Sequence, residues 1–239
     1  MGPIVRWRRG VVAAVVAAFL ASVLAACSSG GPAHPSTASL PPAAGLLKDS
    51  AAAMKKVGSA RFDLAGSGRI AGVEVRSAQG LVTADGRAQG SVKIVQAGAV
   101  VELQLVVVGG DIYIKGPTGQ FAKLPAAAAG ASFDPSQILN PDRGLSALLQ
   151  FATDGKTLGE EQVDGVDAYR VMADLDGSLV SHLMPLPAAN KVPGTLWVAK
   201  DTSDLIQVAV TAPQAGGQSA HLTLHLSDFG VQTHITPPT

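Results

Sequence analysis

The sequence predicts an α+β fold in which one strongly curved antiparallel sheet carries helices against its apolar face. Residues 60–115 and 157–229 alternate between apolar and polar side chains with a period of two, which is typical of strands with one face in water. Helical patterns precede and separate these two regions. A second arrangement also fits the pattern, namely two smaller β-rich domains that divide near residue 155.

The chain begins with a secretory signal that ends in a lipidation motif. Three arginines, Arg6, Arg8 and Arg9, precede an apolar run over 11–23 that is too short to read as a full membrane span. The run Leu24-Ala25-Ala26-Cys27 is typical of a bacterial lipoprotein signal, in which the cysteine thiol receives a diacylglyceryl group. The alternative is a free cysteine that happens to follow a signal, but the sequence has no second cysteine to pair with it.

These features predict three parts: a signal peptide over 1–26, a flexible tether over 27–42 and a folded domain over 43–239. The tether is rich in Ser, Gly and Pro and has little to bury. Three of the 18 basic residues lie in the signal, so the mature chain has 15 against 18 acidic ones, a formal net charge of −3. This balance disfavours a nucleic-acid partner, which requires a clustered positive field.

The first elements of the domain are a helix and about five strands. Residues 43–57 place Leu47, Ala51 and Met54 near one helical face, and Gly58 ends the helix. Over 60–115 the period of two predicts an antiparallel meander, with turn signals between the runs at Gly66-Ser67-Gly68, Asp85-Gly86 and Gly109-Gly110.

Short helices and further strands follow. Residues 134–139 and 140–151 predict two helices, the second with Leu145, Leu148, Leu149 and Phe151 packed on one stripe, and 178–184 predicts a third. Strands are expected over 157–163, 169–173, 195–199, 205–212 and 220–229. In the last of these, the leucines at 222, 224 and 226 face one side, and the residues between them face the other.

A catalytic or metal site is hard to assemble from these residues. The sequence contains neither a Gly-x-Ser-x-Gly elbow nor a His-Glu-x-x-His run. On a strand, His221 and His225 would lie about 13 Å apart, too far for one ion, and Glu160 and Glu161 would point to opposite faces. Glycine pairs such as Gly109-Gly110 precede strands rather than helices, which disfavours a phosphate cradle. We therefore expect no enzyme activity, cofactor or metal.

The apolar face of the sheet is the remaining candidate site. Apolar residues make up 47% of the chain but aromatic residues only 4%, so small aliphatic side chains either form a tight core or line a space. We expect six of them to point inward, because their strand neighbours Lys93, Glu102 and Gln104 are polar. The six residues are Val92, Ile94, Val101, Leu103, Leu105 and Val107.

Several stretches, in order, resemble the mycobacterial and actinobacterial lipoproteins grouped as LppX, LprA, LprF and LprG. The most specific is Phe133-Asp134-Pro135-Ser136-Gln137-Ile138-Leu139-Asn140-Pro141-Asp142-Arg143-Gly144-Leu145. The others are Leu24-Ala25-Ala26-Cys27, Gly90-Ser91-Val92-Lys93, Gly110-Asp111-Ile112-Tyr113, Asp164-Gly165-Val166-Asp167, Gly194-Thr195-Leu196-Trp197-Val198 and Leu226-Ser227-Asp228-Phe229-Gly230. The resemblance covers nearly the whole mature chain.

The resemblance implies an antiparallel half-barrel with helices on its concave face, enclosing a large apolar cavity for multi-acyl lipids or glycolipids of the triacylated type. It also implies carriage of these lipids from the plasma membrane toward the outer envelope, in some cases beside a membrane efflux transporter. We expect an anchor at Cys27 on the extracytoplasmic face of the cell membrane. The alternative from another class is a structural or signalling envelope lipoprotein whose core is fully packed and carries no lipid.

Overall fold

The computed structural model describes residues 39–67, 74–125, 135–183, 190–213 and 219–238. Residues 39–239 form one compact unit, and residues 1–38 lie outside the described part of the chain. The signal peptide, most of the tether and Cys27 therefore lie outside the described residues.

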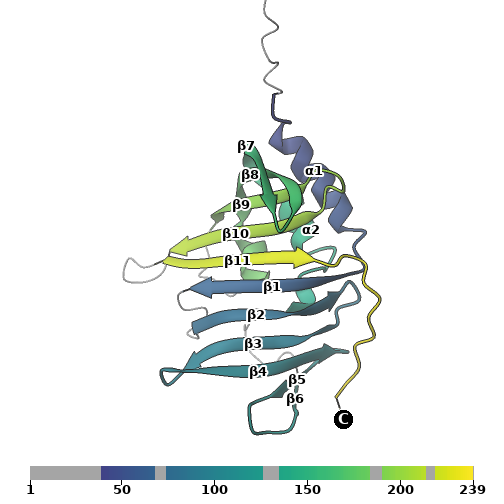
Figure 1. The fold of residues 1–239 in the computed structure, drawn as a ribbon, viewed down its shortest axis with the longest axis vertical. Helices are drawn as coiled ribbons and strands as arrows, with labels where there is room; N and C mark the ends of the chain where they lie inside the picture. Colours follow the sequence, from purple (N-terminus) through teal and green to yellow (C-terminus); the bar gives the residue numbers. More distant parts are fainter. Residues whose placement is uncertain (1–38, 68–73, 126–134, 184–189, 214–218, 239) are drawn as a thin grey trace, which may run out of the picture. The chain divides into compact units, whose positions relative to one another are not determined.

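The described unit is built mainly from strands, which pair as one antiparallel sheet (Figure 1). The helical elements are α1 (Ala43–Met54), the 3-10 turn η2 (Pro135–Gln137), α2 (Leu145–Gln150) and α3 (Gly177–Leu183). The strands are β1 (Ser59–Ser67), β2 (Glu74–Thr83), β3 (Ala88–Gln96), β4 (Ala99–Val108), β5 (Asp111–Lys115), β6 (Ala122–Pro125), β7 (Thr153–Val163), β8 (Val166–Asp176), β9 (Lys191–Ala199), β10 (Leu205–Pro213) and β11 (Ser219–Ser227).

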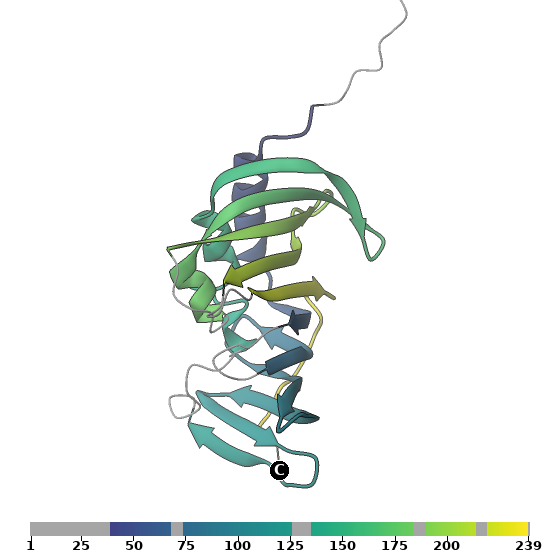
Figure 2. The ribbon, with the colours of Figure 1, turned by 90° about the vertical axis from the view of Figure 1, so that its left-hand side faces the viewer.

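The strand order is β6-β5-β4-β3-β2-β1-β11-β10-β9-β8-β7, which joins the two halves of the sequence in one sheet. The joint is the antiparallel pairing of β1 with β11, where Phe62 lies opposite Leu226 and Leu64 opposite Leu224. The arrangement with two domains divided near residue 155 is therefore wrong, because strands from both sides of that point form one continuous ladder. The sheet is curved and not closed, with β6 and β7 at its two ends (Figure 2).

The core lies between the helices and one face of this sheet. Leu47, Ala51 and Met54 of α1 are buried, as their helical spacing predicts, and they belong to the same apolar cluster as Leu148 of α2 and Leu196 of β9. Figure 2 shows the helices over the part of the sheet formed by β7 to β10. In β11, Leu222, Leu224 and Leu226 are buried, which confirms the face predicted from their alternation.

Two local expectations need correction. Phe151 does not pack with the leucines of α2: it is the residue after the helix and its exposed fraction is 57%. Gly66 and Ser67 do not form a turn but continue β1, because Gly66 pairs with Leu222 of β11 and a side chain there would meet the Val75 carbonyl oxygen at 2.9 Å. The short strand β6 was not predicted, since four residues give too little alternation to recognise.

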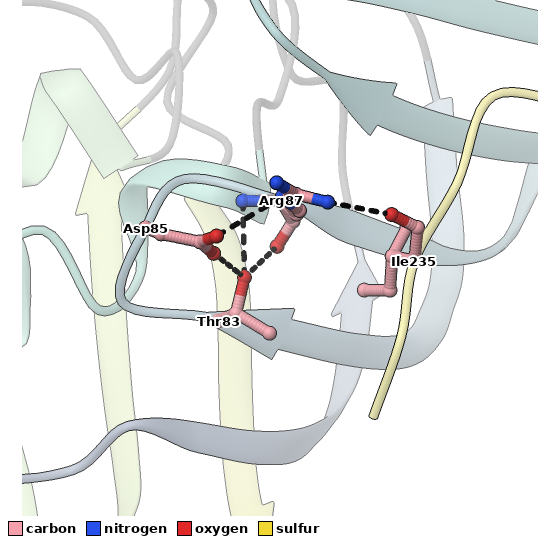
Figure 3. Close-up of polar contacts among 4 residues, drawn as sticks. All are labelled: Thr83, Asp85, Arg87 and Ile235. Carbon is pink, nitrogen blue, oxygen red and sulfur yellow. Dashed lines mark hydrogen bonds and ion pairs between the residues drawn. The ribbon is translucent and has the colours of Figure 1, made fainter. Parts of the chain in front are cut away.

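The C-terminal segment after β11 is tied to the ends of the first strands. The Ser59 hydroxyl donates to the Val231 carbonyl at 2.6 Å, and the Arg87 guanidinium donates to the Ile235 carbonyl at 3.1 Å (Figure 3). Arg87 is itself held by Asp85, 3.0 Å from its Nε atom, in the turn between β2 and β3. Ile235 is buried, with an exposed fraction of 1%, so the tail contributes to the core.

Candidate functional site

The six residues predicted to point inward lie on one face of β3 and β4. The register pairs Ile94 with Val101 and Val92 with Leu103, and it places Leu105 and Val107 farther along the same face. Alternation along each strand turns Lys93, Glu102 and Gln104 to the other side. The structure therefore brings the six side chains together, and their role in lining a lipid cavity stays a prediction.

Burial along this face is uneven. Val107 is buried in the main core, whereas Val92, Ile94 and Leu105 are half-buried and pack against its margin. Val101 and Leu103 are also half-buried. The same face of the sheet at β8 and β9 carries fully buried residues such as Val171 and Leu196 beneath the helices. An aliphatic surface thus extends from the closed core into a part of the sheet that remains partly open.

Neighbouring strands extend this surface. Ile114 of β5 lies opposite Leu105, and Ala78 of β2 lies opposite Val92. In the sequence, Ile114 alternates with Tyr113 and Lys115, which places it on the opposite face of the strand from these two residues. Alternation does not identify the residue that lies opposite it on the neighbouring strand. The pairing adds Ile114 to the candidate site, because it is half-buried and packs against the main core.

Two glycines leave a gap in the middle of the surface. Gly80 of β2 pairs directly with Gly90 of β3, between Phe62 on one side and Leu105 on the other. A Cβ on either glycine would overlap the backbone of the partner strand, so side chains are excluded from this row. The face therefore has a strip without side chains between two apolar residues.

The opposite face of the same strands is charged. Lys93 and Glu102 lie 4.0 Å apart across β3 and β4, and Lys123 of β6 lies 2.8 Å from Asp111 of β5. The hydrogen bond to Asp111, followed by its negative charge, raises the pKa of Lys123 above its ordinary value. Lys123 therefore keeps its positive charge at physiological pH, and more than half of the Lys93 and Glu102 side chains is exposed on this face.

Two hollows open on the described surface. One, of about 490 Å³, is lined by α1 and α2, chiefly by Leu47, Ala51 and Leu149, with Lys48 and Lys55 at its rim. The other, of about 340 Å³, is polar: it lies at the paired glycines Gly80 and Gly90 and is lined by residues such as Gln79, Ser91 and Gln104. Neither contains a nucleophile held by a base, and we assign no chemistry to them.

The histidines and paired carboxylates occupy separate surface contacts. His221 contacts the Thr211 hydroxyl at 3.0 Å, and His225 lies 3.3 Å from Asp164. Glu160 pairs with Lys200, whereas Glu161 pairs with Arg170, as expected for side chains on opposite faces of a strand. Among the residues that the structure describes, no three potential ligands come together to hold a metal ion.

Cys27 falls outside the described residues, so its acylation stays a prediction. None of the helices in the described part of the chain has the length and apolar character needed to cross a bilayer.

Comparison with known proteins decides the family. The family model described as LppX_LprAFG lipoprotein matches residues 42–235 of the chain. The chain belongs to this family. It is 32% identical over 233 residues to the lipoarabinomannan carrier protein LprG of Mycobacterium tuberculosis, covering 97% of this chain and 95% of the relative. The LprG of Mycolicibacterium smegmatis is also 32% identical, over 93% of each chain.

Two solved structures of LppX_LprAFG proteins support the fold. The crystal structure of LprF from Mycobacterium bovis matches with a TM-score of 0.70 and 22% identity, covering 82% of this chain and 96% of that one. The crystal structure of the M. tuberculosis lipoprotein LppX matches with a TM-score of 0.60 and 20% identity, covering 83% and 100%. The resemblance inferred from sequence motifs and the open antiparallel sheet are thereby confirmed.

Proposed function

We propose that this protein binds multi-acyl lipids or glycolipids on the apolar face of β2 to β5 and carries them from the plasma membrane toward the outer cell envelope. The observation that supports this most directly is the set of half-buried aliphatic side chains on β3 and β4, continuous with the closed core. A soluble domain does not ordinarily leave such a surface open unless something covers it. The name of its LprG relatives, lipoarabinomannan carrier protein, supports a glycolipid cargo.

The composition of the face suits flexible acyl chains. Val92, Ile94, Val101 and Leu103 offer aliphatic contact without ring planes or hydrogen-bonding groups that would select one rigid ligand. The strip at Gly80 and Gly90 provides a path along which a chain can lie between Phe62 and Leu105. Triacylated cargo is proposed because one sheet face of this extent can accept several chains side by side.

The energetics of transfer explain why such a carrier is needed. Burial of one methylene group is worth about 0.8 kcal/mol, so exposing a chain of about 16 carbons to water costs on the order of 12 kcal/mol. A lipid with two or three chains does not cross an aqueous space unaided. The carrier must offer a surface nearly as favourable as the bilayer, and it needs no catalytic chemistry.

In this proposal an acyl anchor on Cys27 holds the domain at the extracytoplasmic face of the cell membrane, within reach of the donor lipid. The tether predicted over 27–42 gives the domain freedom to turn between the donor and an acceptor. A membrane efflux transporter is the proposed partner at the donor side.

Val92→Trp tests the lipid-binding face. The larger side chain fills open space in a lipid site, so lipid recovered by mass spectrometry of organic extracts should fall while the unfolding temperature changes little. Val208→Trp is the matched control, because Val208 is fully packed on the same face and overpacking costs about 1–3 kcal/mol.

The outcomes separate the two functional classes. Parent protein that contains no acylated lipid, together with a Val92→Trp variant as destabilised as Val208→Trp, would favour a packed structural or signalling lipoprotein. Release of fatty acid from the bound lipid above background would contradict the carrier function and indicate an esterase.

A further inference from the structure

The hairpin between β3 and β4 ends in a tip that carries apolar residues on both faces and one polar side chain, Gln96. Val95 pairs with Val100 on the outer face and Ile94 pairs with Val101 on the inner face. No charged residue occurs in the sequence from Ile94 to Val101. The exposed fraction of Val100 is 63%, the highest among the large apolar residues that are exposed in the described part of the chain.

The turn residue at this tip is also unusual. Ala97 and Gly98 have φ angles of 51° and 80°, the left-handed pair of a two-residue hairpin turn. Asn or Asp is favoured at the first of these positions, because alanine in the left-handed region is disfavoured. The tip therefore keeps an apolar residue at a position where a polar residue would be more stable in water.

The hairpin between β7 and β8 provides an internal comparison. Asp164 and Gly165 have φ angles of 48° and 85°, so this turn has the same geometry with the favoured Asp-Gly pair. Acidic residues surround it, and Asp164 is paired with His225. The same backbone turn is thus polar at one hairpin and apolar at the other, which indicates that the apolar character of the β3–β4 tip is not a requirement of the turn.

We infer that the β3–β4 hairpin tip inserts into the surface of a phospholipid membrane. The first charged residues of the hairpin itself, Lys93 and Glu102, lie four strand positions behind Ala97 and Gly98 respectively, about 13 Å from the turn. Beside the hairpin, Glu74 of β2 lies opposite Val95, two strand positions or about 7 Å behind the turn. The tip is therefore free of charge to a depth of about 7 Å, which falls within the 5–10 Å to which interfacial elements enter the boundary between headgroups and acyl chains. A membrane surrounds both faces of an inserted hairpin, whereas a protein partner docked on one face would leave the other in water.

The tip adjoins the proposed lipid-binding face, so its insertion would bring that face next to the membrane. Ile94 and Val101 on its inner face are followed by Val92 and Leu103, so the tip is continuous with the proposed lipid-binding face. A lipid leaving the bilayer along the hairpin would pass Gln96 at the turn and then meet apolar side chains from Ile94 and Val101 onward. The inference rests on the proposed function, and it assigns to these residues the step in which the lipid enters or leaves.

Insertion is tested by depth-dependent quenching. The mature full-length protein is mixed with vesicles of phosphatidylethanolamine and phosphatidylglycerol that contain brominated acyl chains. A Val100→Trp variant should show a blue-shifted emission and strong quenching after subtraction of the parent signal, which contains Trp197. The matched control is Val166→Trp at the tip of the β7–β8 hairpin, where the exposed fraction is 45%. Quenching of the Val100→Trp variant no stronger than that of the control would overturn the inference.

A second experiment separates this inference from the proposed function. Val100→Asp should slow uptake of lipid from vesicles by about tenfold relative to Val166→Asp, because a carboxylate is far costlier than valine in the membrane. Lipid supplied in detergent should bind both variants equally. Uptake by Val100→Asp at the parent rate would overturn the insertion and leave the carrier function intact, whereas absence of lipid from every protein would overturn both. Loss of a parent dimer in the Val100→Asp variant would instead assign the tip to self-association.

Discussion

Gly80 and Gly90 lie directly opposite each other in β2 and β3, with their backbones in contact where any side chain would collide with the partner strand. This pair sets the spacing of the sheet in the middle of the candidate lipid-binding face. Both positions require glycine for steric reasons, since neither has the positive φ that would favour glycine by itself.

Gly90→Ala should therefore destabilise the fold by about 1–3 kcal/mol, because the added methyl group forces the strands apart. Denaturant unfolding measures the change. Gly45→Ala is the matched control: Gly45 lies on the exposed side of α1 with open space around it, and alanine there should add about 0.5–1 kcal/mol of stability. Equal effects of the two substitutions would show that the strands can separate without cost.

Arg87→Ala should loosen the C-terminal tail. The substitution removes the bond to the Ile235 carbonyl and costs about 1 kcal/mol, and hydrogen exchange after residue 228 should accelerate. Arg76→Ala is the control, because Arg76 pairs only with Glu74 near the surface and should change stability by less than about 0.5 kcal/mol. Ile235→Ala should cost more than Arg87→Ala, about 2–5 kcal/mol, since it empties a buried site. A tail that exchanges at the parent rate in Arg87→Ala would show that Ile235 alone holds it.

Asp176 should stabilise α3 at neutral pH, and this stabilisation should be lost in acid. Its carboxylate accepts bonds from the Ser178 hydroxyl at 2.5 Å and from the Leu179 N–H at 3.1 Å, and these bonds lower its pKa below the ordinary 3.8. A lowered pKa in the folded state gives stability that is present above pH 3.8 and is lost as the pH falls through the folded value.

Asp176→Ala should remove this part of the acid dependence and cost about 1 kcal/mol at neutral pH through loss of the helix cap. Unfolding in urea between pH 2 and 7 measures both effects. Asp49→Ala, at an exposed position of α1, should leave the acid profile unchanged. An identical profile for Asp176→Ala and the parent would contradict the capping role.

Ala97→Asn should stabilise the isolated protein and weaken its contact with membranes. Asparagine is favoured in the left-handed conformation that Ala97 adopts, so unfolding should become harder by about 0.5–1 kcal/mol. The added amide would at the same time resist insertion of the hairpin tip. Thermal unfolding and vesicle co-sedimentation measure the two effects, and a gain in both would argue against a membrane role for the tip.

Cys27→Ala should release the protein from membranes and leave the signal uncleaved or miscleaved. The expectation rests on the motif Leu24-Ala25-Ala26-Cys27. Membrane fractionation and the intact mass of the mature protein are the measurements. Unchanged retention together with an unchanged mass would show that Cys27 is not the anchor.

Much of the sheet could be predicted, because the alternation of apolar and polar residues along a strand shows which side chains are exposed to water. The faces of β4 and β11 follow directly from residues such as Leu103 and Leu224. Which parts of those faces the helices cover could not be predicted, because the alternation within a strand does not show where a helix will pack. The same alternation describes Val107, which is buried, and Val101, which is half-buried.

Local sequence patterns also gave wrong or incomplete predictions at positions where tertiary contacts determine the structure. Phe151 continues the helical spacing of α2 but follows its last residue, so it turns outward. The anchoring of Ile235 by Arg87 joins residues 148 positions apart, and no local pattern contains that pairing. The apolar β3–β4 tip was visible in the sequence, but only the φ angle of Ala97 shows that its turn departs from the favoured residue type.

The pairing of β1 with β11 affects how the chain reaches its folded state. These strands are the first and last of the sheet in sequence, yet they lie side by side at its centre, with Arg61 opposite Ser227. Because the chain is made from its N-terminus, the meander that begins with β1 is available first, and β1 keeps one unpaired edge until the final strand β11 has been made. Contacts this distant in sequence close slowly.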